Sequence, residues 1–393
     1  MHAKRILQGF LTKMCPTMHA KRRACVAKAV EAVHVGGLTL VRMSRALTTK
    51  TSLRHRIKCC DRLLSNPHLQ AEKITVYRAL SHGVLGNQRV AIIIDWSDLT
   101  ADGSAHLLRA AVMVKGRAFV VYEEVHSRKD YGSQRVHRRF LVKLRSVLPK
   151  GCQPILVTDA GFRSTWFQIA NELKYEWIGR IRNRDMVREL GGEQWNGCKT
   201  WYPHANSRPR VLGQFEYARS NPVACRLVAF KKGPKHRHRR TAFGANSRST
   251  SSLKNRAAQI EPWLLAVSPG LDALGAKTIT AMYAGRMQIE QTFRDVKNSK
   301  WGMGLSNSLT RDPQRLAILL LLAALLSYAL WLIGLAAAQT GYTVGYGSRK
   351  KAPTTLSILS LARNWTFERR QPHPSRTQLT NALNEMRRLV MKI

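Results

Sequence analysis

Three acidic residues in a chain that is poor in acids stand where carboxylates can bind metal ions. Asp95 follows the apolar run "VAIII" and Asp159 follows "PILVT", so we expect each at the end of a buried β-strand. A carboxylate in that position pays a desolvation cost unless it is paired, hydrogen-bonded or bound to a cation. Taken alone, either aspartate is also explained as the N-cap of a following helix. The third acid, Glu290, lies in "YAGRMQIEQTFRDVK", residues 283–297, which we predict to be one helix.

That predicted helix carries a mixed polar face. At about 100° per residue, Tyr283, Arg286, Glu290 and Lys297 fall within about 60° of one another. The adjoining buried stripe consists of apolar residues, namely Met282, Ile289, Phe293 and Val296. An exposed helix with a Glu–Lys pair is the alternative, but it requires neither the tyrosine nor the strand acids. The spacing therefore favours a functional face.

Three converging carboxylates suit two divalent cations that act on a phosphodiester. Such a metal pair activates the attacking water or hydroxyl and stabilises the leaving oxygen. Hard oxygen ligands favour Mg²⁺, which Mn²⁺ can replace, over zinc. Arg286 and Lys297 would then hold DNA phosphates beside the metals. We exclude Asp98 as a ligand, because strand alternation places it less favourably than Asp95.

The charge of the chain indicates a polyanionic partner. Its 393 residues include 65 Lys and Arg against 23 Asp and Glu, which gives a formal charge of +42. This excess goes beyond what solubility requires and favours nucleic acid. The 7 cysteines form no CxxC pair, so we expect reduced thiols in a cytosolic protein. We also expect no secretory leader, because no apolar run with a cleavage site follows the basic N-terminus.

One apolar segment, residues 316–338, is long enough to span a bilayer. Ser327, Tyr328 and Gly334 interrupt it, and dense positive charge on both sides gives no positive-inside asymmetry. We predict a buried core helix and no membrane partner. A single-span membrane protein is the alternative, and it would partition into membranes.

The N-terminal part, residues 1–85, is predicted to be a helical DNA-binding domain. Within it, "LTLVRMSRAL" and "TTKTSLRHRIKCCDRLL" indicate a short helix, a polar turn and a second helix. The second helix carries Arg54, Arg56 and Lys58, which we predict to contact DNA. A solvated basic face on a small bundle explains the same residues equally well.

The rest of the chain divides into three further parts. An α/β catalytic core is predicted for residues 86–184 and 276–340. In this part three strands are followed by helix, strand, helix and strand, and this order favours a mixed sheet flanked by helices. Residues 185–275 are predicted to be a β-rich insertion, whose basic run "KKGPKHRHRRTAFGANSRSTSS" orders on nucleic acid. Residues 341–393 are predicted to be a helical C-terminal region.

Three segments resemble the bacterial cut-and-paste DDE transposases of the insertion-sequence four family. "YAGRMQIEQTFRDVK" matches the family signature Y-x2-R-x3-E-x6-K, and "IIIDWSD" and "VTDAGFRSTWF" match the contexts of its first and second catalytic aspartates. The order of the acids agrees, as does the long gap that holds the family's β-rich insertion. Over nearly its whole length the chain is most similar to the transposon ten (insertion-sequence ten) branch.

The resemblance implies a ribonuclease H-like core in which Asp95, Asp159 and Glu290 bind two Mg²⁺. It implies nicking at a transposon end, hairpin formation and opening, and strand transfer of the 3′-OH into target DNA. The implied partners are double-stranded terminal inverted repeats, target DNA and a second copy of the chain in a synaptic homodimer. The implied location is the bacterial cytoplasm, at the nucleoid when DNA is bound. The alternative is a catalytically inactive or repurposed transposase-derived DNA-binding protein.

The resemblance also implies roles for single residues outside the acid trio. In these enzymes the signature Tyr, Arg and Lys contact transposon-end phosphates, which assigns DNA contacts to Tyr283, Arg286 and Lys297. A Trp in the insertion stacks on a flipped base, and "PWLLAV" matches its position, giving Trp263. A core aromatic on a strand is the alternative for Trp263. We interpret Met303 and the surrounding "WGMGL" as packing.

Overall fold

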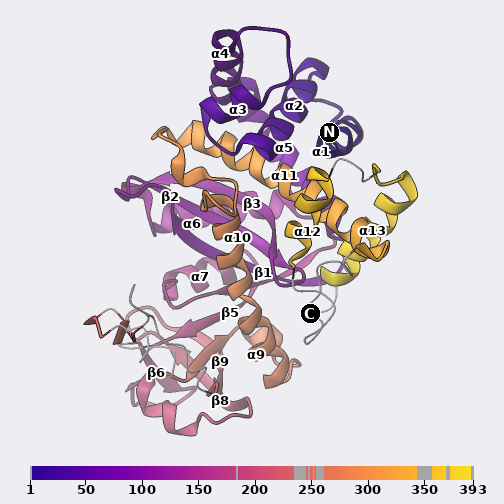
Figure 1. Cartoon of the computed structure of the whole chain (residues 1–393). Coiled ribbons are helices and arrows are strands. Elements are labelled where there is room, and N and C mark those ends of the chain that lie inside the picture. The colour runs from indigo at the N-terminus through magenta and orange to yellow at the C-terminus, as the bar shows by residue number, and fades with distance from the viewer. Residues whose placement is uncertain are drawn as a thin grey trace. The chain divides into compact units, whose positions relative to one another are not determined.

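The chain forms two compact units. The first contains Met1–Gln153 and Met287–Lys392, and the second contains Pro154–Arg286 (Figure 1). The computed structural model describes residues 2–182, 185–233, 245–246, 248–250, 252–253, 261–342, 356–368 and 372–390. Most of the basic run predicted to order on nucleic acid lies outside these residues.

The first unit is largely helical. Its helices are α1 (His2–Met14), α2 (Ala20–Gly36), α3 (Leu40–Ala46), α4 (Leu53–Leu64), α5 (Pro67–Val84), α6 (Gln134–Val147), α10 (Met287–Lys297), α11 (Pro313–Gln339), α12 (Ile358–Phe367) and α13 (Arg376–Val390). Ser, Thr, Asn or Asp side chains accept backbone N–H bonds at the starts of α3, α4, α5, α6 and α11. These caps satisfy donors that a helix start leaves unpaired, so local sequence fixes where these helices begin.

Three strands of the first unit form an antiparallel meander: β1 (Arg89–Asp98), β2 (Ala105–Met113) and β3 (Ala118–Ser127). In the register, Asp95 lies opposite Arg109, and Arg109 lies opposite Glu123. Residues directly opposite in a sheet share one face, so three charged side chains form a row. The prediction that Asp95 ends its strand is wrong, because pairing continues to Asp98. The apolar run ended at Asp95, but backbone hydrogen bonding did not.

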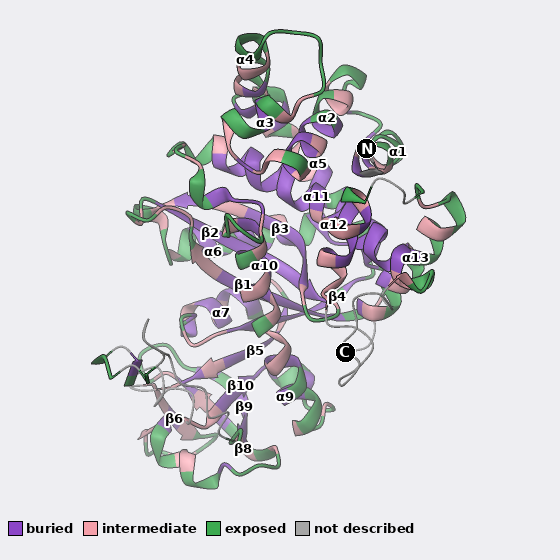
Figure 2. Ribbon diagram, in the orientation of Figure 1, coloured by how far each residue is buried: buried purple, intermediate pink, exposed green. Residues whose placement is uncertain are grey.

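The apolar segment predicted as a core helix is α11. In its most apolar window 89% of the residues are buried, and α11 packs against α2, α5, α12, α13 and β3 (Figure 2). A Cβ added to Gly334 would lie 2.2 Å from Ile358 O, so this glycine permits the close approach of α12. Over the described ranges, α11 is the single helix apolar and long enough to cross a membrane, and the bent pair α2–α3 is a second candidate. The burial of α11 agrees with the core-helix prediction.

The second unit is built on a mixed sheet. Its strands are β4 (Gln153–Thr158), β5 (Glu176–Ile181), β6 (Met186–Glu189), β7 (Asn196–Gly197), β8 (Arg210–Tyr217), β9 (Val223–Phe230) and β10 (Trp263–Val267), and its helices include α7 (Ser164–Glu172) and α9 (Ala276–Gly285). The strand order is β4-β5-β10-β9-β8-β6-β7, with β4 and β5 parallel and the other pairs antiparallel. The predicted succession of strands and helices, and with it the mixed α/β class, is confirmed.

The signature segment is two helices instead of the one that periodicity predicted. Helix α9 ends at Gly285 and α10 begins at Met287, with Arg286 between them. Glycine is less favourable than alanine in a helix interior by about 1 kcal/mol, which explains why α9 ends at Gly285. The periodicity of the apolar residues does not include this cost. The predicted single helix is therefore interrupted at Arg286, and Glu290 and Lys297 keep their helical spacing within α10.

Candidate functional site

Asp95 lies within the row of charges on the three-stranded sheet of the first unit. The residue is 7% exposed, and its Oδ1 accepts a hydrogen bond from the backbone N–H of Trp96 at 2.9 Å. Because β1 continues past Asp95, no helix follows that this aspartate could cap. The N-cap alternative for Asp95 is therefore wrong. Its carboxylate is carried by a buried strand, as a preorganised ligand requires.

Arg109, opposite Asp95, is held by a buried acid. Its Nε and Nη2 each lie 2.7 Å from Glu123 Oε2, and Tyr77 on α5 donates to Glu123 Oε1 at 2.9 Å. The guanidinium lies 4.9 Å from the ring centroid of Phe293 on α10. Burial and the Glu123 carboxylate both raise the pKa of Tyr77, so its hydroxyl stays protonated and donates. These contacts tie β2 and β3, the other strands of the meander, to two helices.

Spacing along the sequence does not predict this buried network. A single charged residue inside the apolar run "AHLLRAAVMV" was the available signal for Arg109. Burying an unpaired guanidinium is costly, so an arginine in a fully buried strand requires a buried partner. The identity of that partner depends on the register between β2 and β3, which spacing along one strand does not encode.

Replacement of Glu123 by glutamine is expected to lower the free energy of unfolding by about 3–5 kcal/mol, because Arg109 is left buried without a counter-charge. Urea unfolding of the purified variant measures this loss. Glu385→Gln is the matched control, because Glu385 pairs with Arg388 on the surface of α13; an exposed pair contributes about 0–1 kcal/mol. Equal stabilities of the two variants would contradict the role given to Glu123.

Helix α10 brings Glu290 and Lys297 to the same strands. The helix packs against β1, β2 and β3, and Lys297 Nζ donates to Ser97 Oγ at 2.7 Å. Ser97 is two residues after Asp95, so both side chains project from one face of β1. Burial lowers the pKa of Lys297, and the carboxylates of Asp98 and Glu290 oppose part of that shift. Two predicted acids, far apart in sequence, are thus carried by packed elements of one unit.

The opposite face of β1 packs on α6. Trp96 Nε1 donates to His137 Nε2 at 3.3 Å, and burial lowers the pKa of His137 to about 4. The imidazole is therefore neutral near pH 7 and can accept this bond. Asp98 lies on this face too, with an exposed side chain whose Oδ1 is 2.9 Å from His106 Nδ1. This geometry agrees with the strand alternation on which Asp98 was judged less favourable than Asp95, and its exclusion as a ligand stays a prediction.

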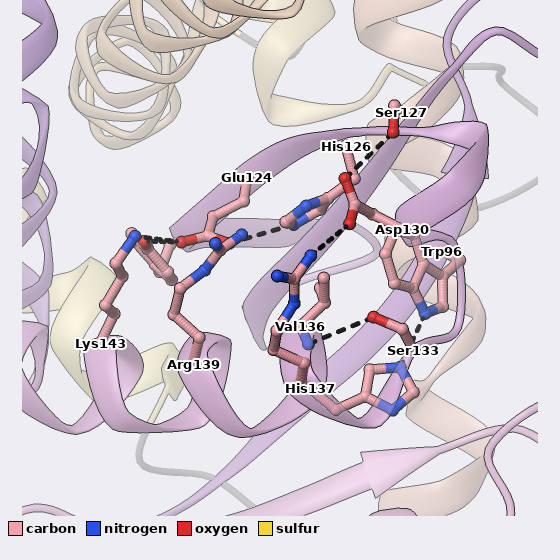
Figure 3. Close-up of polar contacts among 12 residues, drawn as sticks. Trp96, Glu124, His126, Ser127, Asp130, Ser133, Val136, His137, Arg139 and Lys143 are labelled. Carbon is pink, nitrogen blue, oxygen red and sulfur yellow. Dashed lines mark hydrogen bonds and ion pairs between the residues drawn. The ribbon is translucent and has the colours of Figure 1, made fainter.

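Glu124 is the centre of a polar cluster on this second face (Figure 3). It accepts hydrogen bonds from Tyr122 at 2.6 Å and Lys143 at 2.8 Å, and its Oε2 lies 3.0 Å from His126 Nε2. Burial alone would raise the pKa of Glu124, but these bonds lower it to about 2. The cluster fixes β3 against α6, on the face of the sheet opposite to Asp95.

Asp159 directly follows β4 in the second unit, as predicted. Its Oδ1 accepts a bond from the backbone N–H of Gly161 at 2.8 Å, and the N-cap of α7 is Arg163. The N-cap alternative for Asp159 is therefore wrong as well. Asp159 lines a polar pocket together with Ala160, Gly161, Arg163, Arg182, Asp185 and Lys199. Its three cations, Arg163, Arg182 and Lys199, outnumber its two carboxylates, which suits a phosphate group.

Three of the predicted DNA contacts cluster in the second unit. The rings of Trp263 and Tyr283 lie 4.9 Å apart at 75°, and the Arg286 guanidinium lies 6.0 Å from the Tyr283 ring centroid. Trp263 begins β10, opposite Phe230. Tyr283 is 5% exposed, and burial raises its pKa while Arg286 counteracts the shift. The two aromatic rings and the guanidinium therefore pack together in one cluster.

The predicted DNA contacts of the N-terminal region lie on α4. Arg54 and Lys58 are exposed, whereas Arg56 is half-buried and its Nη1 donates to Leu47 O at 3.0 Å. Lys58 also lines a cationic pocket with residues of α2 and α4, among them Lys21, Arg22, Lys28 and Arg62. Arg56 thus stabilises the end of α3, while Arg54 and Lys58 are available to a ligand. Their contact with DNA stays a prediction.

The acids fit a hard metal ion by their chemistry. Asp95, Asp159 and Glu290 offer carboxylate oxygens, the donors that Mg²⁺ and Mn²⁺ prefer. Within the ranges that the structure describes, no group of three or more His, Cys, Asp or Glu residues is gathered to hold a metal. Asp95 and Glu290 belong to the first unit and Asp159 to the second. The three-acid metal site stays a prediction.

Comparison with protein families gives one match. A family model described as "Transposase DDE domain" matches residues 86–327 of the 393. The matched segment begins just before β1, ends within α11 and contains all three acids. The mixed α/β architecture is consistent with the ribonuclease H-like fold expected for this domain. A comparison with curated proteins gave no match.

Proposed function

The chain belongs to the transposase DDE domain family, and on this premise we propose that it is a metal-dependent DNA transposase of the cut-and-paste type. The observation that carries the proposal is the family match, because it encloses Asp95, Asp159 and Glu290 in order. Within the family we assign the chain to insertion-sequence four, transposon ten branch. The signature "YAGRMQIEQTFRDVK" supports this finer assignment.

We assign metal binding to Asp95, Asp159 and Glu290, with two Mg²⁺ or Mn²⁺ per active site. When bound, such metals activate water and stabilise the charge on the phosphodiester. Asp95 is suited to this role because a rigid, buried strand carries it. The hydrogen bond from Lys297 to Ser97 supports the position of Glu290, since it fixes α10 on that strand.

We assign DNA binding to cations around these acids. Arg286 and Lys297 bind transposon-end phosphates, together with the hydroxyl of Tyr283. Trp263 stacks on an extruded base, which offsets the cost of removing that base from the duplex. Arg163, which lines the pocket next to Asp159, positions a further phosphate. The formal charge of +42 supports a partner as anionic as DNA.

The reaction that we propose has four steps. Water attack at a transposon end nicks one strand and frees a 3′-OH, which then attacks the opposite strand to form a hairpin. Water reopens the hairpin, and the released 3′-OH attacks target DNA. The DNA partners are terminal inverted repeats and a target duplex, held by a homodimer in the bacterial cytoplasm.

The cleavage test uses the DNA that flanks the gene, where the proposal requires short inverted repeats bounded by direct duplications. The purified chain is mixed with an end-labelled duplex of this DNA, and denaturing gels follow the nick, the hairpin and the joined product. Mg²⁺ or Mn²⁺ is expected to give all three, and removal of divalent metal is expected to leave binding without cleavage. Binding without cleavage in both metals would instead identify a DNA-binding protein that lacks transposase activity.

A further inference from the structure

The turn after α10 presents a large aromatic side chain to solvent. Trp301 is 82% exposed, whereas Met303 is 3% and Leu305 2% exposed. The interpretation of "WGMGL" as packing is correct for Met303 and wrong for Trp301. An indole carries about 150–250 Å² of surface, and its burial against a partner would be favourable.

The backbone of Trp301 is anchored on several sides. Asn298 Oδ1 accepts the backbone N–H of Lys300 and that of Trp301, each at 2.8 Å. Arg363 on α12 donates from Nη1 to Trp301 O at 2.5 Å, and Met303 N donates to Asp295 O at 2.7 Å. The indole therefore projects from a preorganised turn, which lowers the entropy cost of binding.

The charges beside Trp301 determine which partner it fits. Arg294 and Lys300 are exposed, and in the part of the chain that the structure describes neither side chain forms a salt bridge with a carboxylate. The turn also lies only a few residues beyond Lys297 and its bond to Ser97. A flat apolar ring on a turn that carries Lys300 and directly follows the helix of Arg294 is complementary to a nucleobase and its phosphates, because bases stack on aromatic side chains in positively charged grooves.

We propose that Trp301 is a stacking platform for an unpaired DNA nucleotide, with Lys300 and Arg294 binding the adjoining phosphates. The face of a base in an intact duplex is covered by its neighbours, so Trp301 engages a nucleotide that has left the stack. The proposal rests on the proposed function, because α10 also carries Glu290. It adds to the chain a contact that distinguishes single-stranded from paired DNA near the cut.

Equilibrium binding of two labelled probes tests the proposal: a fully paired transposon-end duplex, and the same duplex with several unpaired nucleotides beyond its end. Trp301→Ala is expected to weaken binding of the second probe by about 5- to 150-fold, the range for losing one stacked base. Binding of the paired probe and the salt slope stay unchanged. Trp301→Phe keeps most of the affinity, and Lys300→Gln reduces the salt slope by about one.

Leu309→Ala is the matched control, because Leu309 is 92% exposed on the following connection and has no assigned ligand. It is expected to bind both probes like the wild type. Melting temperatures check that each variant is folded. Unchanged binding by Trp301→Ala, or an equal loss on both probes, overturns the stacking proposal. So does a shift from dimer to monomer with both affinities intact, since that result assigns Trp301 to a contact between copies.

Failure of the stacking proposal is distinguishable from failure of the proposed function. Wild-type protein that binds both probes but never cleaves them with Mg²⁺ or Mn²⁺ overturns the transposase activity alone. Active protein whose Trp301→Ala variant prefers unpaired ends as strongly as wild type overturns the stacking alone.

Discussion

Replacement of Asp95 by asparagine is expected to reduce metal-dependent cleavage by about 10²–10⁴-fold, since a bound metal contributes several kcal/mol to the transition state. Asparagine keeps the shape of the side chain and can still accept the N–H of Trp96. It lacks the negative charge that a divalent cation requires. Cleavage of a labelled end duplex at saturating DNA, in Mg²⁺ and in Mn²⁺, measures the loss.

The contacts in the sheet around Asp95 indicate that this substitution changes the chemistry without disturbing the fold. Arg109 is opposite Asp95 but donates its hydrogen bond to Glu123, so loss of the Asp95 charge leaves that buried pair intact. We therefore expect DNA binding and the melting temperature to stay close to those of the wild type. A loss of activity with unchanged binding separates chemistry from folding.

Asp98→Asn is the matched control for this experiment. It makes the same chemical change three residues later, on the other face of β1, where the side chain is 73% exposed and next to His106. Full activity is expected. Wild-type cleavage by Asp95→Asn, or an equal loss in both variants, would refute the role given to Asp95.

Binding of the end duplex is expected to weaken by about 10³–10⁵-fold between 50 and 200 mM salt, if about 6–10 phosphates are contacted. The cause is release of the counterions that surround DNA, and a chain with a formal charge of +42 displaces many of them. A plot of log K against log salt gives the number of contacts, at about 0.9 per phosphate. A slope shallower than about −2 would argue against a DNA substrate.

Single charge changes locate those contacts. Lys58→Gln is expected to reduce the slope by about one, because Lys58 is exposed on α4 beside a cationic pocket. Arg388→Gln is the control, since Arg388 pairs with Glu385 on α13 and changes the net charge equally. Equal slopes for the two variants would show that the overall charge, and no contact by α4, sets the salt dependence.

Much of the architecture could be predicted from the sequence. Apolar β-branched runs predicted β1 and β4, and the apolar segment of α11 was expected in the core, where it lies. Asp159 was predicted directly after its strand, where the structure has it. Such features are local: the period of apolar residues and the position where it stops are set by a few neighbours. The three candidate acids were likewise selected from spacing along the chain, and their role stays a prediction.

Other features depended on the tertiary structure. The sequence alone did not show that pairing runs past Asp95 to Asp98, that Arg109 meets Glu123, or that Lys297 reaches Ser97. Each depends on the register or the packing between segments that are distant in the chain. The residue spacing within one segment shows which of its faces is apolar, but it does not show which other segment packs on that face. Long-range packing also decides which side chains are buried. Trp301 and Met303 are both apolar residues of the segment "WGMGL". The first is exposed and the second is buried because of how the surrounding turn packs. The sequence by itself therefore determined which residues are candidates for the chemistry and most of the elements that carry them, while the tertiary structure decided their neighbours, because those contacts are long-range.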